Sequence, residues 1–156
     1  MAKREKWLTA VGIVAAIVCT VYTIGNVKEF VSFAKRHNTT IEELVERYQA
    51  TLPISEDFKN GVSTLIGIEI RKDSLVYINR IDACDSILTI VRKSNLAAVL
   101  RPLALQTIVS EYKTTLLTKK VCDAQMVISY LSFDPFGNLM ASVCLTPDDY
   151  LPLLTK

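Results

Sequence analysis

The chain has a single histidine, His37, and only five glycines among its 156 residues. One histidine does not provide the Ser-His or Cys-His pairs that activate a nucleophile in a folded domain, and no G-x-G-x-x-G or Walker loop occurs. Asp82 with Asp85, and Asp148 with Asp149, could hold a cation, but such pairs are more typical of helix caps. The sequence therefore predicts no catalytic residue, no metal site and no cofactor.

Cysteine is too sparse for a metal cluster. Cys84, Cys122 and Cys144 are 38 and 22 residues apart, with no C-x-x-C pair and no histidine nearby, which argues against zinc. Together they permit one disulfide and one free thiol in an oxidising compartment. Cys144 as a reactive thiol is a weak alternative, because no basic neighbour in the sequence would lower its pKa.

The chain also lacks an excess of charge outside its amino terminus. Of 18 basic and 16 acidic residues, Lys3, Arg4, Lys6 and Glu5 precede residue 28, which leaves 15 of each sign in the remainder. Nucleic-acid binding normally needs a basic face that neutralises phosphates. We therefore expect no nucleic-acid partner.

The most conspicuous feature present is a run of 21 residues, 7–27, without a charged side chain. As a helix it would be roughly 31 Å long, close to the roughly 30 Å hydrocarbon core of a bilayer. A cleaved signal peptide usually has a shorter apolar region, and the remaining chain is too short to surround a fully apolar core helix. We predict a single transmembrane helix.

Small residues recur on one side of this segment. Gly12, Ala16 and Thr20 are four residues apart, with Thr23 next. This spacing lets two membrane helices approach closely, although ordinary membrane composition can also produce it. We name these four residues as candidates for packing against another membrane subunit or a second copy.

Basic residues flank the segment on both sides, so the positive-inside rule is nearly balanced. A short basic tail before an apolar run is typical of a signal anchor, and a long following domain is translocated largely regardless of its charge. We therefore expect a cytoplasmic amino terminus and an extracytoplasmic domain, with the bacterial inner membrane as the expected location.

The rest of the chain divides by composition and turn signals. Thr39 with Glu42, or Thr40 with Glu43, forms a capping box that predicts a helix ending before Pro53. A linker is expected at 52–60. The predicted segments are a basic tail 1–6, a transmembrane helix 7–27, a helical stalk and linker 28–60, a soluble domain 61–147 and an apolar tail 148–156.

Hydrophobic alternation predicts two hairpins, the first formed by strands 63–70 and 75–81, the second by strands 126–133 and 139–146. Helical spacing predicts a helix over 83–95 and a longer one over 102–120, with Pro102 in its first turn. The expected fold class is α+β, a small antiparallel ββ-α-ββ domain with helices on one sheet face and the other face available.

Alternation also assigns faces within two strands. In the first hairpin, Ile66, Ile68 and Ile70 are expected to share one face. In the last strand, the apolar face is expected to contain Leu139, Ala141, Val143 and Leu145.

If the two middle helices form an antiparallel pair, Cys84 and Cys122 would be neighbours, so they are a candidate disulfide. The alternative is three reduced, buried thiols that pack as small hydrophobic side chains. The carboxyl-terminal tail is unusually apolar for a free end, and we name four of its residues as a candidate partner-binding tail: Tyr150, Leu151, Leu153 and Leu154.

The order of elements from 61 to 146, with Cys122 after a long helix and the D-x-x-G turn at 134–137, resembles that of small periplasmic domains of the bacterial envelope. Many such domains have no assigned activity, so the resemblance implies an envelope location and no particular chemistry.

These observations favour a non-enzymatic, single-pass accessory subunit or assembly factor of a membrane protein complex. Its anchor would contact other membrane subunits, and its domain would dock a partner by the open sheet face, an edge strand or the tail. The alternative is a membrane-anchored sensor that binds a small apolar ligand, lined by Tyr77, Tyr112, Tyr130 and Phe133.

Overall fold

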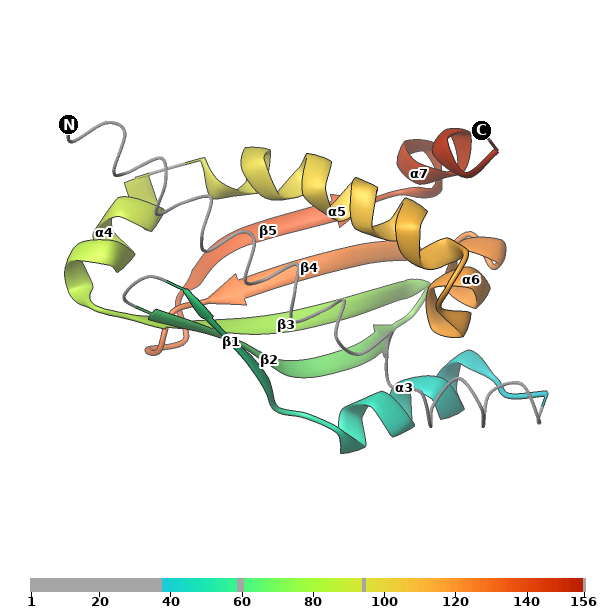
Figure 1. Ribbon diagram of the computed structural model, residues 1–156, viewed down its shortest axis with the longest axis horizontal. Helices are drawn as coiled ribbons and strands as arrows, with labels where there is room; N and C mark the ends of the chain where they lie inside the picture. Colours follow the sequence, from blue (N-terminus) through green and yellow to red (C-terminus); the bar gives the residue numbers. More distant parts are fainter. Residues whose placement is uncertain (1–37, 59–60, 94, 156) are drawn as a thin grey trace.

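The computed structural model describes residues 38–58, 61–93 and 95–155 (Figure 1). The predicted membrane segment 7–27 lies outside the described residues. No helix within those three ranges is long and apolar enough to span a membrane.

Five strands form one sheet in the order β1-β2-β3-β4-β5, so the predicted α+β class is confirmed. The β2–β3 and β4–β5 hairpins pair antiparallel, also as predicted. The strands are β1 (Ile54–Phe58), β2 (Gly61–Arg71), β3 (Ser74–Ala83), β4 (Val127–Phe133) and β5 (Leu139–Leu145).

The prediction of a wholly antiparallel sheet was wrong, because β3 and β4 pair in parallel, with Ser74 opposite Val127. Parallel neighbours need a connection that carries the chain back to the starting end of the first strand. Here the helical segment between Ala83 and Val127 provides this return (Figure 1). Strand propensity alone does not reveal strand direction.

The connection contains three helices where two were predicted: α4 (Asp85–Lys93), α5 (Leu96–Tyr112) and α6 (Leu116–Asp123). The helix expected over 102–120 was misplaced at both ends. Helix α5 begins six residues earlier, where Asn95 caps it, and it accommodates Pro102 in its interior. It ends at Tyr112, before a separate α6.

The segment expected to be stalk and linker contributes to the fold. The capping box of Thr40 with Glu43 begins α3 (Ile41–Ala50), and the helix ends before Pro53 as predicted. The linker expected over 52–60 was wrong, because β1 lies there and pairs antiparallel with the start of β2. Helix α3 packs on β2 and α6.

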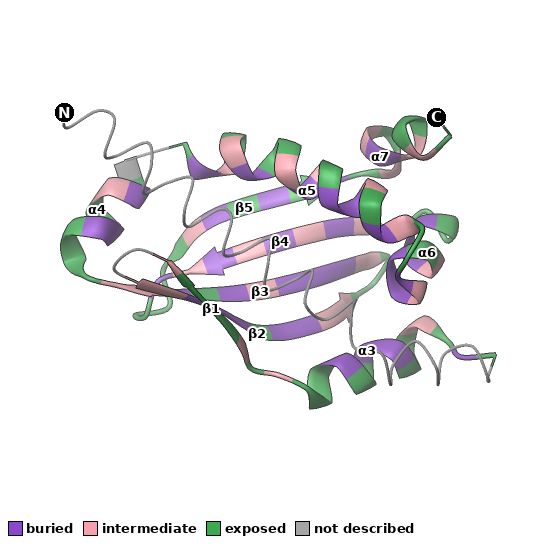
Figure 2. Ribbon diagram, in the orientation of Figure 1, coloured by how far each residue is buried: buried purple, intermediate pink, exposed green. Residues whose placement is uncertain are grey.

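The helices cover one face of the sheet, which we call the inner face. Helix α5 packs on β5 at one side and α3 on β2 at the other (Figure 1). One hydrophobic core joins inner-face residues of the strands to residues of the helices. Figure 2 shows the buried residues running along β2 to β5 beneath the helical layer.

The carboxyl-terminal segment is helix α7 (Pro147–Leu154), so the prediction of a free tail was wrong. Tyr150 is completely buried, and its hydroxyl donates to the carbonyl oxygen of Met126 at 2.7 Å. Arg101 of α5 donates to the carbonyl oxygen of Cys144 at 2.8 Å and to Asp149 at 2.6 Å. These bonds fix α7 against α5 and β5.

We expect Tyr150→Phe to lower the free energy of unfolding by about 1 kcal/mol, because it removes this buried hydrogen bond and leaves a carbonyl without a partner. Urea denaturation followed by circular dichroism measures the change. Leu153→Ala, on the exposed side of the same helix, is the control and should shift the midpoint far less. Equal effects of the two substitutions would contradict the role given to the hydroxyl.

Candidate interaction surface

The outer face of the sheet carries a line of apolar side chains that the described helices leave uncovered. Strand pairing places Gly67, Ile78 and Leu131 side by side on β2, β3 and β4, and Phe133 opposite Leu139. None of these apolar side chains belongs to the hydrophobic core. We call the following set the apolar stripe: Ile66, Ile78, Leu131, Phe133 and Leu139.

A β-bulge places Ile66 in the stripe. Leu65 pairs with Asn79 and Gly67 pairs with Ile78, so Ile66 is the extra residue, and it is 41% exposed. A bulge of this kind changes which residues of a strand face the core. The prediction that Ile66 shares a face with Ile68 and Ile70 was therefore wrong. Gly67 has no side chain, and a Cβ there would lie 3.3 Å from Cδ1 of Ile78, so the isoleucine packs over it.

A second irregularity places Leu139 in the stripe. Ser132 pairs with Ala141, but Phe133 pairs with Leu139, so the register shifts by one residue at Met140. Ala141, Val143 and Leu145 are buried as predicted, whereas Leu139 is 56% exposed. Its expected place on the buried face was wrong. Both irregularities are local backbone features that alternation does not encode.

The turn beside the stripe is organised by Asp134 and presents Phe136, which is 76% exposed. The buried Asp134 carboxylate accepts from the backbone N–H groups of Phe136 and Asn138, at 2.9 and 2.8 Å, and from Arg92 of α4. Burial alone would raise the pKa of Asp134, but hydrogen bonds from Asn138, Arg92 and Phe136 bring it down to about 2. Phe136 thus projects from a well-anchored turn.

Two ion pairs lie beside the stripe. Arg80 donates to both carboxylate oxygens of Asp82, at 3.2 and 2.9 Å, and Arg71 pairs with Glu69. These pairs place charges of both signs at the border of the stripe.

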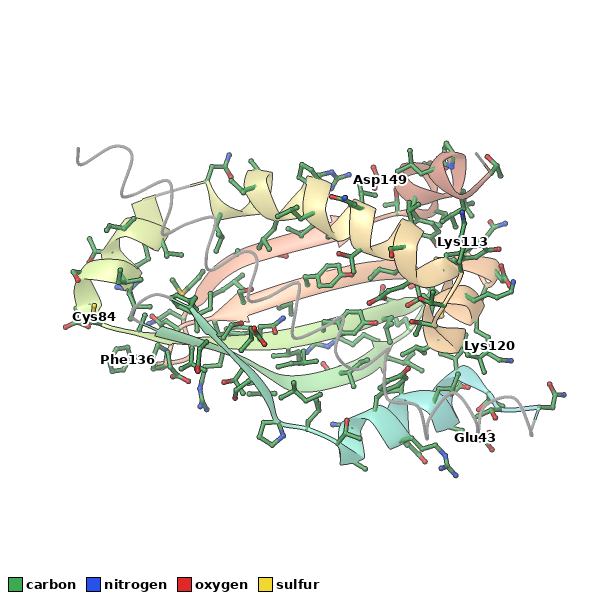
Figure 3. All side chains as sticks on the ribbon, viewed as in Figure 1. Glu43, Cys84, Lys113, Lys120, Phe136 and Asp149 are labelled. Carbon is green, nitrogen blue, oxygen red and sulfur yellow. The ribbon has the colours of Figure 1, made fainter. Side chains whose placement is uncertain are left out.

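The structure separates the two cysteines proposed as a disulfide, so that prediction was wrong. Cys84, Cys122 and Cys144 are all free thiols. Cys84 follows the end of β3, whereas Cys122 precedes β4, whose start lies beside the start of β3. The length of β3, roughly 30 Å, separates them, whereas disulfide Cα atoms lie about 4.4–6.8 Å apart. Figure 3 shows Cys84 and Phe136 at one end of the molecule and Lys120, from the same helix as Cys122, at the other.

The four aromatic residues proposed to line a ligand cleft do not converge. Tyr77 and Tyr130 stack on the inner face, with ring centroids 5.1 Å apart. Tyr112 donates to Asp123 at 2.8 Å at an exposed site, and Phe133 lies on the outer face. These positions contradict a single cleft formed by all four.

Of the other named residues, Gly12, Ala16, Thr20 and Thr23 lie outside the described ranges, so their role stays a prediction. In α7, Leu151 and Leu154 are half-buried against the core and Leu153 is exposed. No cluster of three or more metal-ligating side chains occurs within residues 38–58, 61–93 and 95–155.

The sequence predicts an open sheet face, but the residues on that face were missed. The signal was present in strand 126–133, where Val127, Leu131 and Phe133 alternate with buried Ile128 and Tyr130. In a strand, odd-numbered and even-numbered residues point to opposite faces. Apolar residues at both kinds of position therefore indicate that both faces of the strand are apolar.

Among the described helices, one carboxylate is buried, that of Glu111 in α5. Burial raises its pKa to about 7, although a hydrogen bond of 2.9 Å from the Thr118 hydroxyl to Oε2 lowers it. Oε1 is buried without a partner. The Glu111 charge adds to burial in raising the pKa values of Tyr48, Tyr77 and Tyr130. Charge at Glu111 therefore destabilises the fold.

Neither a protein-family model nor a curated protein matches this chain. Among solved structures, a protein from Pseudomonas aeruginosa inferred to be secreted matches with a TM-score of 0.53 and 9% identity, over 70% of this chain and 88% of that one. Type 2 secretion system pilotins from Vibrio vulnificus and Vibrio cholerae match with TM-scores of 0.45 and 0.40 and identities of 14% and 13%. Each pilotin match covers 70% of this chain, and 86% and 87% of the respective pilotin. The Pseudomonas match shows that the mixed α+β fold is shared, and nothing beyond the fold.

We expect Cys84 to react with iodoacetamide fastest of the three described thiols at near-neutral pH. Hydrogen bonds from Ser86 and from the backbone N–H of Ile87 lower the pKa of the exposed Cys84 thiol. Burial raises the pKa of Cys122 to about 12. Peptide mapping by mass spectrometry should find Cys122 unmodified until the protein is unfolded. Faster labelling of exposed Cys144 than of Cys84 would contradict the ranking.

We expect Glu111→Gln to remove a pH dependence of stability. The unfolded carboxyl titrates near 4.5 and the folded one near 7, so the folded state holds the proton more tightly between these values. Stability therefore falls as pH rises through this window, by about 3 kcal/mol in total. Chemical denaturation from about pH 4 to about pH 8 should show the variant matching the native chain at low pH and exceeding it at high pH.

Glu46→Gln is the matched control, because Glu46 lies at an exposed position of α3. It removes the same charge without relieving a buried one. If the free energy of unfolding of the native chain and of Glu111→Gln changed with pH in the same way, ionisation of buried Glu111 would not lower stability.

Proposed function

We propose that this protein is a non-enzymatic accessory subunit or assembly factor of a membrane protein complex in the cell envelope. In this proposal its domain binds a partner protein through the outer face of the sheet. The observation that carries the proposal is the apolar stripe, a row of side chains across four strands that no described helix covers. Contiguous exposed apolar surface is typical of protein interaction sites.

The chemistry of the face favours an apolar protein surface as the partner. Phe136 stands on an anchored turn, so an interface would bury an aromatic ring that loses little conformational freedom. The nearby charges are already paired as Arg80 with Asp82 and Arg71 with Glu69. The stripe itself contains no charged side chain, so a strongly charged partner would meet no complementary charge within it.

The membrane attachment is part of the proposal. Residues 7–27 would form the anchor, and Gly12, Ala16, Thr20 and Thr23 would pack against a membrane helix of the partner complex. The amino terminus would be cytoplasmic and the described domain extracytoplasmic. The uncharged length of 7–27 supports the anchor, and the basic tail supports the orientation.

A photo-crosslinking amino acid at Ile66 or Leu139 of the full-length protein, in membranes of its native host, tests the docking face. Both side chains are substantially exposed, so replacement should leave the fold intact. We expect irradiation to join each position to the same discrete protein. A crosslinker at Glu46 on α3 is the control and should give no such product.

Ile66→Lys should abolish the product formed from position 139, because a charge in the stripe would be buried without a partner. Leu153→Lys, an equivalent change on exposed α7, should leave it. A product that survives Ile66→Lys, or an adduct only between copies of this chain, would overturn docking to a different protein through this face.

A further inference from the structure

The Glu111 carboxylate lies where α6, α3 and the sheet meet. Glu111 is on the last turn of α5, and the Thr118 hydroxyl of α6 donates to its Oε2 at 2.9 Å. Burial raises the pKa values of Tyr48 in α3, Tyr77 in β3 and Tyr130 in β4, and the Glu111 charge raises them further. Ionisation of this one side chain therefore acts on two helices and the sheet together.

The groups that face Glu111 do not neutralise its charge. They are the Thr118 hydroxyl, the three phenols and the thiol of Cys122, whose pKa is raised by burial, by Asp123 and by Glu111. Oε1 is buried and has no hydrogen-bond partner. Glu111 also lies at the carboxyl end of α5, where the backbone carbonyl groups carry partial negative charge. An ionised Glu111 in the closed core is therefore poorly compensated.

The cations of the surrounding helices lie away from Glu111. In α6, Lys119 forms an ion pair at the surface. Lys120 is two residues from Thr118, so it lies on the opposite side of that helix. Arg47 of α3 is exposed. These three side chains therefore leave the carboxylate without a counter-ion.

Strand β5 and helix α7 also pack on α5, and their sequences contain no lysine, arginine or histidine. In α7, Asp149 pairs with Arg101, Asp148 is exposed, and the Tyr150 hydroxyl donates to a backbone carbonyl. Cys144 of β5 is exposed. Neither element brings a positive charge to Glu111.

A proton is an occupant that needs no additional space. It removes the charge of Glu111 and leaves the packing unchanged. Burial raises the Glu111 pKa to about 7, although the hydrogen bond from Thr118 lowers it. Loss of the proton to solvent leaves a buried carboxylate that must be hydrated, and hydration requires one of the surrounding elements to move.

Helix α3 is the element that moves at least cost. It has 10 residues, too few for a stable isolated helix, and it is attached to the core by Leu44, Val45 and Tyr48. It lies at the border of the helical layer, whereas α6 is joined at its two ends to α5 and β4 (Figure 1). Openings of peripheral segments cost less free energy than global unfolding.

We propose that Glu111 is a proton-controlled latch for α3. With the proton bound, α3 stays packed on β2 and α6. Once the proton is lost, α3 separates and water reaches the carboxylate. The latch lies in the helical layer, so it is independent of docking by the outer face. In the proposed anchored protein, release of α3 would lengthen the connection between the domain and the bilayer.

Hydrogen–deuterium exchange of the full-length protein in detergent micelles, resolved by peptide mass spectrometry, tests the latch. Exchange at about pH 5 and about pH 8 is corrected for the intrinsic rate at each pH. We expect the opening constant of α3 to rise about 70-fold, because the solvated carboxyl titrates near 4.5 and the buried one at about 7. Opening of β4, which needs global unfolding, should stay at least about tenfold rarer than opening of α3 at both pH values.

Glu111→Gln is uncharged at every pH and should make the opening of α3 independent of pH. Thr118→Val removes the hydrogen bond that lowers the Glu111 pKa, so the transition should move to higher pH. Glu46→Gln is the matched control, because it removes a charge from an exposed position of α3 and should keep the pH dependence of the native chain.

The latch is wrong if α3 opens no more often than β4, or if its opening depends on pH in Glu111→Gln as it does in the native chain. Opening of α6 alone, with α3 protected at both pH values, would also overturn it, because water would then reach Glu111 by another route.

Discussion

Parallel pairing of β3 with β4 is the constraint on which the rest of the described fold depends. It forces the chain to travel from one end of the sheet to the other between Ala83 and Val127, and three helices fill that path. Because these helices pack into one core with the inner face, no described helix covers the outer face. The same constraint places Cys84 and Cys122 at opposite ends of the sheet.

The two faces of the central strands have different chemistry, which a single alternating pattern would not produce. The inner face combines the stacked Tyr77 and Tyr130 pair with three buried polar side chains that have no hydrogen-bond partner. These are Ser63, Asn79 and Ser132. The outer face is apolar along the stripe and ends at the rigid turn of Phe136.

The features that were predicted correctly from the sequence are those that interactions between nearby residues determine. The capping box at Thr40, the helix after Cys84 and both hairpins follow from short-range chemistry and hydrophobic period, and the structure has them. Strand direction, the bulge at Ile66 and the burial of Tyr150 depend on contacts between distant segments, which the pattern does not contain. For the same reason the open face was expected as a surface, while its residues were identified only once the register was known.

Helix α3 and strand β1 belong to the folded unit, because α3 packs on β2 and β1 pairs with β2. In the proposed anchored protein, only residues 28–37 separate the apolar segment from the domain, a tether that reaches at most about 36 Å when fully extended. The domain would then be held close to the headgroups, and its orientation would be restricted. Any partner of the outer face would have to present its own binding surface within this shallow layer above the bilayer.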